Sequence, residues 1–323
     1  MKALVCRELS DDLGKLEFED IELPPAEPGK VRLHIRAASV NFPDLLMVRG
    51  KYQHRPELPF IVGGERAGEV SAVGTDVQSV NIGDRVVGGG LTGAFAEECQ
   101  VPASALRPIP AGMDFASAAA FTTTYLTAYV ALVRRGELQA GETLLVHGAA
   151  GGVGLAAVDL GRVLGARVIA TASTKEKRGF LKDYGAHHVL PSSGFREVVK
   201  ELTDGRGADV IYDPVGGDVF DESTRCIAFN GRLLVVGFAS GRIPSIAANI
   251  PLIKGFSVVG LRAGEYGRRH PEKGRENIAA IDRLLAEKKL RPHIGARFPL
   301  ARAIDAMRAL SERTIIGKAI IEP

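Results

Sequence analysis

The sequence predicts an α/β protein in which a doubly wound parallel sheet follows a β-rich region. In the first hundred residues, short apolar segments alternate with turn-forming residues such as PPAEPGK and GTDVQSVNIGD. From residue 141 onward, six strand candidates appear, and several are continuous apolar runs, as expected for strands buried on both faces. These six candidates are residues 143–147, 167–171, 188–190, 209–212, 232–236 and 256–260.

Helical segments lie between these strands and in the tail. Val153, Ala157, Leu160 and Leu164 recur at helical spacing after the first of the six strands. Further helices are expected over residues 195–202, 220–228, 277–288 and 302–310, with a last strand over 318–321. The most apolar window, 115–133, is interrupted by threonines and tyrosines, which favours a buried helix over a membrane span.

Length and composition predict a two-domain globular protein. The chain has 323 residues and a net charge of +3, and its lysines and arginines are scattered, so no polyanionic partner, nucleic acid or membrane is expected. Its three cysteines are far apart and odd in number, which argues against a disulfide framework and fits a reducing cytoplasm. The N-terminal residues do not have the pattern of a signal peptide.

The stretch HGAAGGVG (147–154) lies between a predicted strand and a predicted helix. Gly151, Gly152 and Gly154 allow a tight turn and a close approach to a pyrophosphate, and the helix N-terminus supplies free N–H groups. Ala149 replaces the usual first glycine, so the fingerprint is a variant. We interpret it as a nicotinamide dinucleotide site; a packing turn, a flavin site and a methyl-donor site are the alternatives.

The end of the next strand bears on the cofactor. An NAD site normally has an acid there for the ribose 2′-hydroxyl, but this strand ends ATASTKEKR (170–178). Residues 171–174 carry no acid, and Lys175, Lys177 and Arg178 follow. Basic and hydroxyl groups suit a 2′-phosphate, so we expect NADPH. The alternative is a solvated basic helix start.

At this point the chain resembles the zinc-independent quinone oxidoreductase (zeta-crystallin-like) family of the medium-chain dehydrogenase/reductase superfamily. The resemblance covers nearly the whole chain. It rests on these segments: VNFPDLLMVRGKY (40–52), TYLTAY (124–129), HGAAGGVG, TASTKEKR (171–178), YGAHHV (184–189), YDPVGG (212–217), VVGFASG (235–241) and IIGKAIIEP (315–323). It implies a GroES-like catalytic domain of residues 1–124 and 263–323, and a Rossmann NADPH-binding domain of residues 125–262.

The same resemblance bears on metal content. The alcohol dehydrogenases of the superfamily hold zinc with a cysteine three residues before an aspartate and with a Gly-His-Glu motif. In this chain Asn41 stands in place of the cysteine and Gly64 in place of the histidine. We therefore expect no metal site. Without a Lewis acid, hydride donation to a quinone or an enone is favoured over alcohol oxidation.

The resemblance also implies individual site residues. Asn41 and Tyr52 are the expected catalytic residues, each able to donate a hydrogen bond to the acceptor carbonyl oxygen, while Leu46 makes the pocket less polar. A turn-stabilising amide and a half-buried loop tyrosine are the structural alternatives for these two residues. The expected cofactor contacts are Thr127, Gly151, Gly152, Val153, Ser173, Lys177, Val215, Gly237, Phe238, Ala239 and Lys318. For His147, Asp213 and Cys226 we expect structural roles.

The function expected from the sequence is NADPH-dependent, metal-free hydride transfer to a quinone by a cytoplasmic enzyme. The family resemblance suggests a homodimer formed through the Rossmann domains. One alternative is an NADPH-dependent reductase of an activated C=C bond of the acrylate, 2-haloacrylate or 2-alkenal type. Another is a non-enzymatic NADPH-binding protein that is crystallin-like or binds RNA. No basic stripe interleaved with aromatic residues supports RNA binding.

Overall fold

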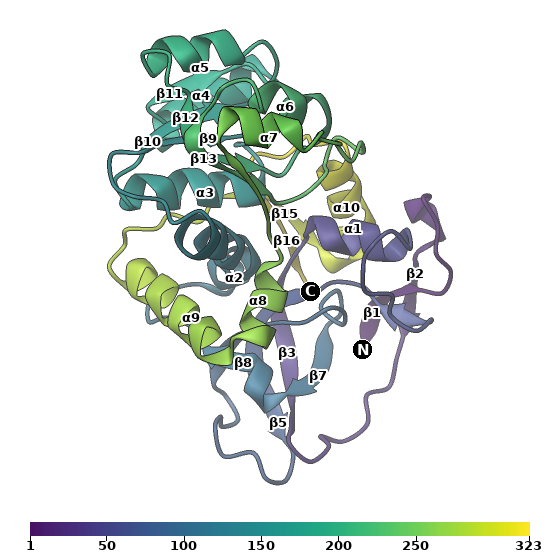
Figure 1. The fold of residues 1–323 in the computed structure, drawn as a ribbon. Helices are drawn as coiled ribbons and strands as arrows, with labels where there is room; N and C mark the ends of the chain where they lie inside the picture. Colours follow the sequence, from purple (N-terminus) through teal and green to yellow (C-terminus); the bar gives the residue numbers. More distant parts are fainter. The chain divides into compact units, whose positions relative to one another are not determined.

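The computed structural model describes residues 1–323 and divides into two compact units (Figure 1). The first unit comprises Met1–Thr123 and Pro292–Pro323, and the second comprises Thr124–Arg291. The first boundary lies within one residue of the sequence-based one. The chain re-enters the first unit at residue 292, whereas the sequence-based boundary was 263, so that boundary is corrected.

The reason for this correction is the packing of two helices, α8 (Ala263–Arg269) and α9 (Pro271–Ala286). They pack against each other, and α8 packs against η3 (Val130–Arg135), a π-helical segment. Arg134 of η3 donates hydrogen bonds to Asn277 (2.8 Å) and Glu276 (2.7 Å) on α9. Both helices therefore belong to the second unit.

The first unit is built mainly on antiparallel strands, and only β15 and β16 pair in parallel. Its larger sheet has the order β15-β16-β3-β5-β6-β8, with β7 also paired to β3, and a smaller sheet has the order β2-β1-β4. The larger sheet contains β3 (Lys30–Ser39), β5 (Glu65–Val73), β6 (Arg85–Gly89), β7 (Glu98–Pro102), β8 (Leu106–Pro108), β15 (Ile294–Pro299) and β16 (Lys318–Glu322). The smaller one contains β1 (Lys2–Cys6), β2 (Glu17–Asp20) and β4 (Phe60–Ile61).

The last strand of the chain supports the start of the first helix. β16 pairs with the end of β3, with Ile320 opposite Ser39, and α1 (Phe42–Val48) begins three residues after that strand. Another helix, α10 (Ala303–Ser311), packs on α1. Residues from opposite ends of the chain thus share one buried apolar core, which includes Leu45, Met307 and Ile321.

The second unit contains the predicted parallel sheet, with the strand order β11-β10-β9-β12-β13-β14. In order of appearance along the chain this is 3-2-1-4-5-6, the order of doubly wound dinucleotide-binding sheets. The strands are β9 (Thr143–Val146), β10 (Arg167–Thr171), β11 (His188–Leu190), β12 (Ala208–Asp213), β13 (Ile227–Val235) and β14 (Ser257–Gly260). The helices within the sheet region are α3 (Gly152–Val163), α4 (Lys175–Tyr184), α5 (Arg196–Leu202), α6 (Gly217–Ser223) and α7 (Asn249–Lys254).

One predicted helix differs clearly from the structure. The sequence-based helix 220–228 is replaced by α6, which ends at Ser223, and by β13, which begins at Ile227. Ile227 pairs with Ala208 of β12, and the Ala208 N–H donates to the carbonyl of Cys226 (2.9 Å). Ladder pairing with β12 therefore overrides the helical preference of this short segment.

The predicted buried helix over 115–133 is present as α2 (Phe115–Tyr129), which continues into η3. The combined helix is long and apolar enough to cross a membrane by length and composition, but 61% of its most apolar window is buried within the protein. The core helix of a soluble protein has the same properties, so this helix is weak support for a membrane span.

Candidate active site

The glycine-rich turn links β9 to α3. A Cβ atom on Gly154 would lie 2.4 Å from the carbonyl oxygen of Gly148, so only glycine fits this close contact between helix and turn. Gly151 is the N-cap of α3, and no side chain accepts from the N–H groups of the first helical turn. These groups at Gly152 and Val153 form an arrangement suited to a pyrophosphate.

The end of β10 is joined to this turn. Ala149 donates its N–H to the carbonyl of Thr171 (3.1 Å), which places the start of α4 beside the glycine-rich turn. Ser173 is exposed, and Lys177 lies partly exposed in the first turn of α4 with its N–H bound to the Thr174 hydroxyl (3.2 Å). Residues 171–174, which carry no acid, and the basic start of α4 therefore lie next to the turn, as the sequence predicts.

The remaining expected cofactor contacts in this unit follow β12 and β13. The Asp213 carboxylate accepts hydrogen bonds from the N–H groups of Val215 (2.8 Å) and Gly216 (2.9 Å). Ala239, in the segment after β13, donates its N–H to the carbonyl of Pro214 (3.0 Å). Val215 and the residues Gly237–Ala239 are thus held together at the carboxyl edge of the sheet.

Strand ends of a doubly wound sheet are where dinucleotides bind, at the point where the strand order reverses. Here β9 lies between β10 and β12, so the order reverses at β9. The structure brings together the contacts predicted at Gly151–Val153, Ser173, Val215 and Gly237–Ala239 along this edge. Thr127 lies in α2 of the same unit and is partly exposed, and its cofactor contact stays a prediction.

The three residues with expected structural roles are buried. His147 contacts the hydroxyls of Thr171 (3.0 Å) and Ser223 (2.8 Å), and burial lowers its pKa to about 3, so the ring is neutral near pH 7. Burial raises the pKa of the Cys226 thiol to about 12, which makes it a poor nucleophile. Asp213 orders the turn after β12, as described above.

The first unit places Asn41 in a buried polar cluster. Its amide nitrogen donates to the Ser39 carbonyl (3.2 Å) and to the Glu65 carboxylate (2.9 Å). Its amide oxygen accepts a 2.6 Å hydrogen bond from the Lys318 ammonium, which also donates to the Val40 carbonyl (3.0 Å) and lies 3.8 Å from Glu65. Both N–H groups of the Asn41 amide therefore have protein partners.

Asp44 and Glu65 complete this cluster, and the sequence-based reasoning had assigned neither of them a role. The Asp44 carboxylate accepts the Asn41 backbone N–H (2.7 Å), and Glu65 accepts the Thr123 N–H (2.7 Å). Desolvation by burial raises the pKa of Asp44 to about 7. The available signal was the presence of one acid in each of the short segments NFPD (41–44) and GGE (63–65), which the family resemblance compares with zinc-binding motifs. Lys318, expected as a cofactor contact, is held inside this cluster.

The Tyr52 hydroxyl differs from the Asn41 amide in having no hydrogen-bond partner in the protein. Its ring is half-buried and packs on the apolar core of the first unit. Two nearby cations are occupied, because Lys51 (2.6 Å) and Arg49 (3.6 Å) both pair with Asp11. Asn41 and Tyr52 are the two residues expected from the sequence to donate to the acceptor oxygen. Of these two, only Tyr52 has a donor proton that no protein group already accepts.

The residues around Asn41 do not fit a zinc ion. The structure gathers no group of three or more His, Cys, Asp or Glu side chains with metal-binding geometry. The polar side chains at this position already surround a cation, the Lys318 ammonium, and none is a thiolate or an imidazole. Catalysis through zinc is therefore not part of the mechanism that we derive.

The two units and their polar groups define a class of protein, namely the two-domain oxidoreductases that combine a GroES-like domain with a dinucleotide-binding sheet. Family models agree with this division. The model described as "Alcohol dehydrogenase GroES-like domain" matches residues 27–111, and the one described as "Zinc-binding dehydrogenase" matches residues 152–282.

Individual relatives narrow the class. The chain is 42% identical to a quinone oxidoreductase-like protein 2 homolog of Nematostella vectensis, covering 99% of this chain and 88% of the relative. It is 33% identical to a mycobacterial protein solved with NADPH (TM-score 0.93) and 28% identical to Escherichia coli quinone oxidoreductase solved with NADPH (TM-score 0.92), with 100% of each chain covered. The chain belongs to the quinone oxidoreductase family of the medium-chain dehydrogenase/reductase superfamily.

Proposed function

We propose that the protein is an NADPH-dependent reductase that transfers a hydride to a quinone without a metal ion. The observation that carries this proposal is the sheet edge at which the uncapped turn at Gly152 meets the end of β10, where residues 171–174 carry no acid and Lys177 follows on α4. Three similar proteins support it: the quinone oxidoreductase-like relative, the Escherichia coli quinone oxidoreductase solved with NADPH, and the mycobacterial protein solved with NADPH.

The residues of this chain would bind the cofactor through backbone and side chains. The N–H groups of Gly152 and Val153 suit the pyrophosphate, and Ser173 and Lys177 suit the 2′-phosphate. The bound cofactor supplies a hydride, that is, two electrons and one proton. A quinone that takes this hydride and one further proton becomes a hydroquinone, so the balance is quinone, NADPH and H⁺ giving hydroquinone and NADP⁺.

The protein must also stabilise the negative charge that develops on the acceptor oxygen. We propose that Tyr52 donates a hydrogen bond to this oxygen, since its hydroxyl has no partner within the protein. Asn41 is bound to Lys318 and Glu65 and would need to exchange a partner in order to donate. We therefore assign Asn41 a positioning role.

Reduction of an activated C=C bond, the second candidate, uses the same cofactor site but is less well supported. A panel of 1,4-benzoquinone, 9,10-phenanthrenequinone, acrolein and 2-chloroacrylate separates the candidates. The proposal predicts that NADPH is oxidised fastest with the two quinones. A preference for acrolein or 2-chloroacrylate would favour the second candidate, and NADPH binding without turnover on any acceptor would favour a non-enzymatic protein.

We propose that the protein is a homodimer formed through the second unit. β14 is the edge strand of its sheet and pairs only with β13. Beside it lie large exposed apolar side chains, including Phe229 (75% exposed), Leu252 (80%) and Ile253 (76%). A second copy that pairs its own β14 here would satisfy the hydrogen-bonding groups of the strand edge and cover this surface.

Sedimentation should then show a dimer, and Leu252→Asp should give a monomer. A wild-type monomer would refute the proposal.

We also propose a cytoplasmic location. All three cysteines, Cys6, Cys99 and Cys226, are free and buried, which is consistent with a reducing compartment. Cell fractionation followed by immunodetection tests this proposal. The expected partner is a small-molecule quinone or enone, with no nucleic acid or membrane needed for activity.

A further inference from the structure

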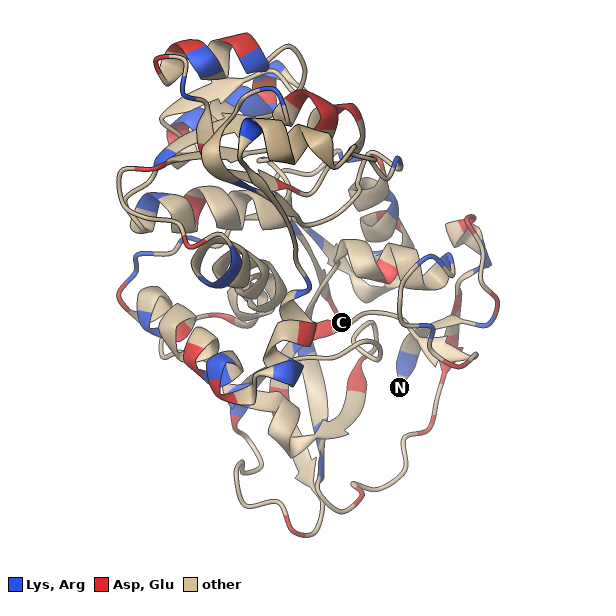
Figure 2. Cartoon of the chain, in the orientation of Figure 1, with Lys and Arg blue, Asp and Glu red and all other residues tan.

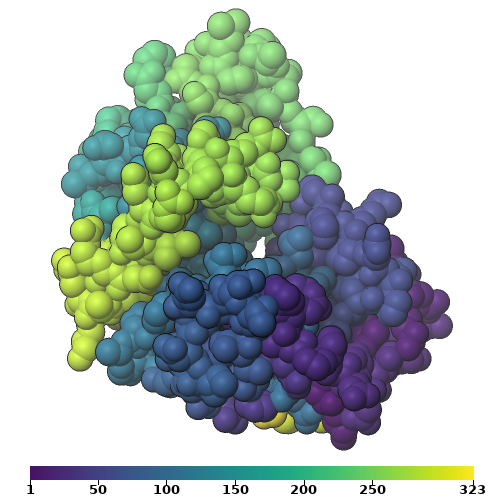
Figure 3. All heavy atoms as spheres, turned by 90° about the horizontal axis from the view of Figure 1, so that it is seen from below, coloured from purple at the N-terminus to yellow at the C-terminus, as the bar shows by residue number.

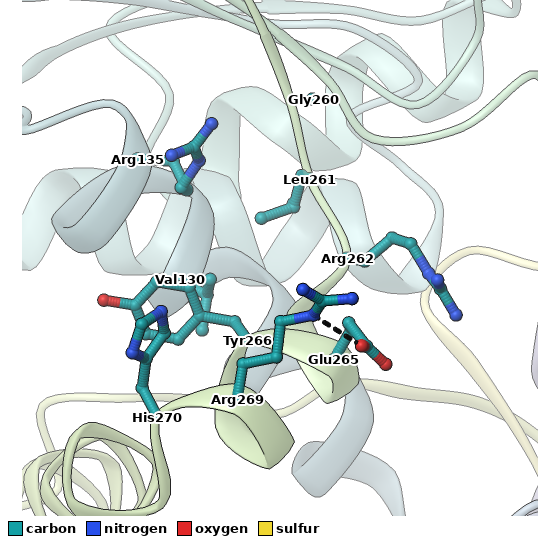
Figure 4. A pocket seen from close by; sticks show the side chains of 9 residues that line it. All are labelled: Val130, Arg135, Gly260, Leu261, Arg262, Glu265, Tyr266, Arg269 and His270. Carbon is teal, nitrogen blue, oxygen red and sulfur yellow. Dashed lines mark hydrogen bonds and ion pairs between the residues drawn. The ribbon is translucent and has the colours of Figure 1, made fainter.

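The second unit contains a pocket of about 200 Å³ between η3, α8 and the end of β14. The residues that line it include Arg135 of η3, Leu261 and Arg262 after β14, and Glu265, Tyr266 and Arg269 of α8. In Figure 4, Leu261 points toward the middle of this group, Arg135 lies above Val130 and Tyr266, and Arg262 extends away on the other side. Figure 3 shows the segment that contains α8 and α9 (yellow-green) as a continuous band at the surface.

The charges of the pocket are unbalanced. Three arginines line it, against one acid, Glu265. Glu265 accepts from Arg268 (3.0 Å) and from the Nε of Arg269 (2.7 Å), which leaves the terminal nitrogens of Arg269 free of this bond. Figure 2 shows basic and acidic residues together on α8.

Arg135 has no hydrogen-bond or ion-pair partner, although its neighbour Arg134 is paired with Glu276 on α9 (2.7 Å). The Tyr266 hydroxyl likewise has no hydrogen-bond partner, and its ring packs on His270 with the centroids 5.1 Å apart. Arg135 also lies on the π-helical segment, a distortion of the helix that often marks functional sites. The pocket thus offers unused donors from two elements.

The pocket begins at the carboxyl edge of the sheet, close in the chain pairing to Gly237–Ala239, which are expected cofactor contacts. Gly260 pairs with Val235 of β13, and the Leu261 N–H donates to the Val235 carbonyl (3.1 Å). Gly237, the first of the three residues expected along the cofactor, follows Val235 by two positions. An acceptor that receives a hydride must lie beside the nicotinamide, so an extension of the acceptor is the group best placed to reach this pocket.

We propose that this pocket binds an anionic substituent of the acceptor, a sulfonate, carboxylate or phosphate, through Arg135 and Arg269, with the Tyr266 hydroxyl as a further donor. This inference rests on the proposed function, because it specifies which quinones the enzyme prefers. A guanidinium is suited to the task, since its planar set of N–H groups matches the oxygens of an anionic group. Neutral quinones are substrates too, but the arginines do not strengthen their binding.

The test compares two quinones that differ in charge, 1,2-naphthoquinone and 1,2-naphthoquinone-4-sulfonate. With Arg135→Gln and with Arg269→Gln, KM for the sulfonate should rise about tenfold, as expected for loss of one charge-assisted contact. KM for the neutral quinone should stay within about twofold. In Arg269→Gln, Glu265 retains Arg268 as a partner. Arg275→Gln, a change at an exposed arginine of α9 outside the pocket, is the matched control and should alter neither KM.

Failure of this inference is distinguishable from failure of the proposed function. If both quinones are turned over and their KM values are the same in Arg135→Gln, Arg269→Gln and the wild type, the pocket assignment is wrong and the proposed function stands. If neither quinone is turned over, the proposed function fails. Calorimetric titration with naphthalene-1-sulfonate and 1-naphthol, which NADPH does not reduce, then still tests whether the pocket binds an anionic group. Sulfonate binding that weakens in Arg135→Gln but not in Arg275→Gln supports an anion site, and equal binding to all three proteins refutes it.

Discussion

The ammonium of Lys318 donates a 2.6 Å hydrogen bond to the amide oxygen of Asn41, a residue 277 positions earlier in the chain. This bond fixes which way the Asn41 amide faces, and it directs the amide nitrogen toward Glu65. The last strand of the chain therefore sets the orientation of a side chain expected in the active site. Lys318 is only 5% exposed and Glu65 only 1%, so neither charge can easily be left alone.

Replacing Lys318 should accordingly destabilise the fold. In Lys318→Met the Glu65 carboxylate stays buried without its cation, and breaking such a pair costs about 3–5 kcal/mol. Urea unfolding measures this loss. Adding Glu65→Gln to the variant should restore a large part of it, because the uncompensated charge is then removed. A double variant as unstable as Lys318→Met would show that the loss has another cause.

Tyr52→Phe should lower turnover and leave the fold intact. Removal of one hydrogen-bond donor to the developing oxyanion costs roughly 10–1,000-fold in turnover. Cofactor affinity and the free energy of unfolding should not change, since the Tyr52 hydroxyl has no partner in the protein. Asn41→Ala, in contrast, should reduce both turnover and stability, because Lys318 and Glu65 each lose a partner. Unchanged turnover of Tyr52→Phe on every active acceptor would disprove the Tyr52 assignment.

Lys177→Ala should weaken NADPH binding selectively. Loss of a charge-assisted contact to the 2′-phosphate should cost about 1–3 kcal/mol for NADPH, whereas NADH, which lacks that phosphate, should be hardly affected. Fluorescence titration of both cofactors measures the difference. Lys182→Ala, in the last turn of the same helix, is the control and should bind both as the wild type does. Equal losses for NADPH and NADH in Lys177→Ala would contradict the 2′-phosphate assignment.

The buried His147 and Asp44 should have opposite effects on the pH dependence of stability. The pKa of His147 is lowered from 6.5 to about 3, so its contribution is present above pH 6.5 and is lost as the pH falls toward 3. The pKa of Asp44 is raised from 3.8 to about 7, so its contribution is present below pH 3.8 and is lost as the pH rises toward 7. Between these limits the two effects largely cancel.

His147→Gln should therefore expose a pH dependence that the wild type hides. The difference in free energy of unfolding, wild type minus variant, should grow with pH by up to about 1.4 kcal/mol per unit between pH 4.5 and 6.5 and be flat above pH 7.5. Urea unfolding at several pH values measures it. A difference that is constant from pH 4.5 to 8 would mean that His147 has an ordinary pKa in the folded protein.

Local patterns in the sequence were sufficient to predict the parallel sheet and the glycine-rich turn at its carboxyl edge, whereas Val215 and Gly237–Ala239 were expected there only through the family resemblance. Continuous apolar runs identify strands buried on both faces, and β10 and β11 have the predicted bounds. The glycines identify the turn because of a local steric requirement at Gly154. These signals act over a few neighbouring residues, and a local pattern can therefore reveal them.

Longer-range features were beyond the reach of local patterns. The helix expected over 220–228 gives way to β13 through pairing with β12, and α8 and α9 stay with the second unit because of side chains such as Arg134. The roles of Glu65 and Asp44 depend on the arrival of Lys318 from the last strand. Such contacts between distant parts of the chain depend on tertiary packing and leave no periodic signal in the sequence.

The most direct test of the central claim is the stoichiometry of NADPH oxidation by metal-free protein with 9,10-phenanthrenequinone. The purified protein is first treated exhaustively with a chelator, and its zinc content is measured by elemental analysis. We predict far less than one zinc per chain, full activity after chelation, and one hydroquinone formed per NADPH oxidised under anaerobic conditions. Nearly one zinc per chain with activity lost on chelation, or no NADPH oxidation above the uncatalysed rate, would contradict it.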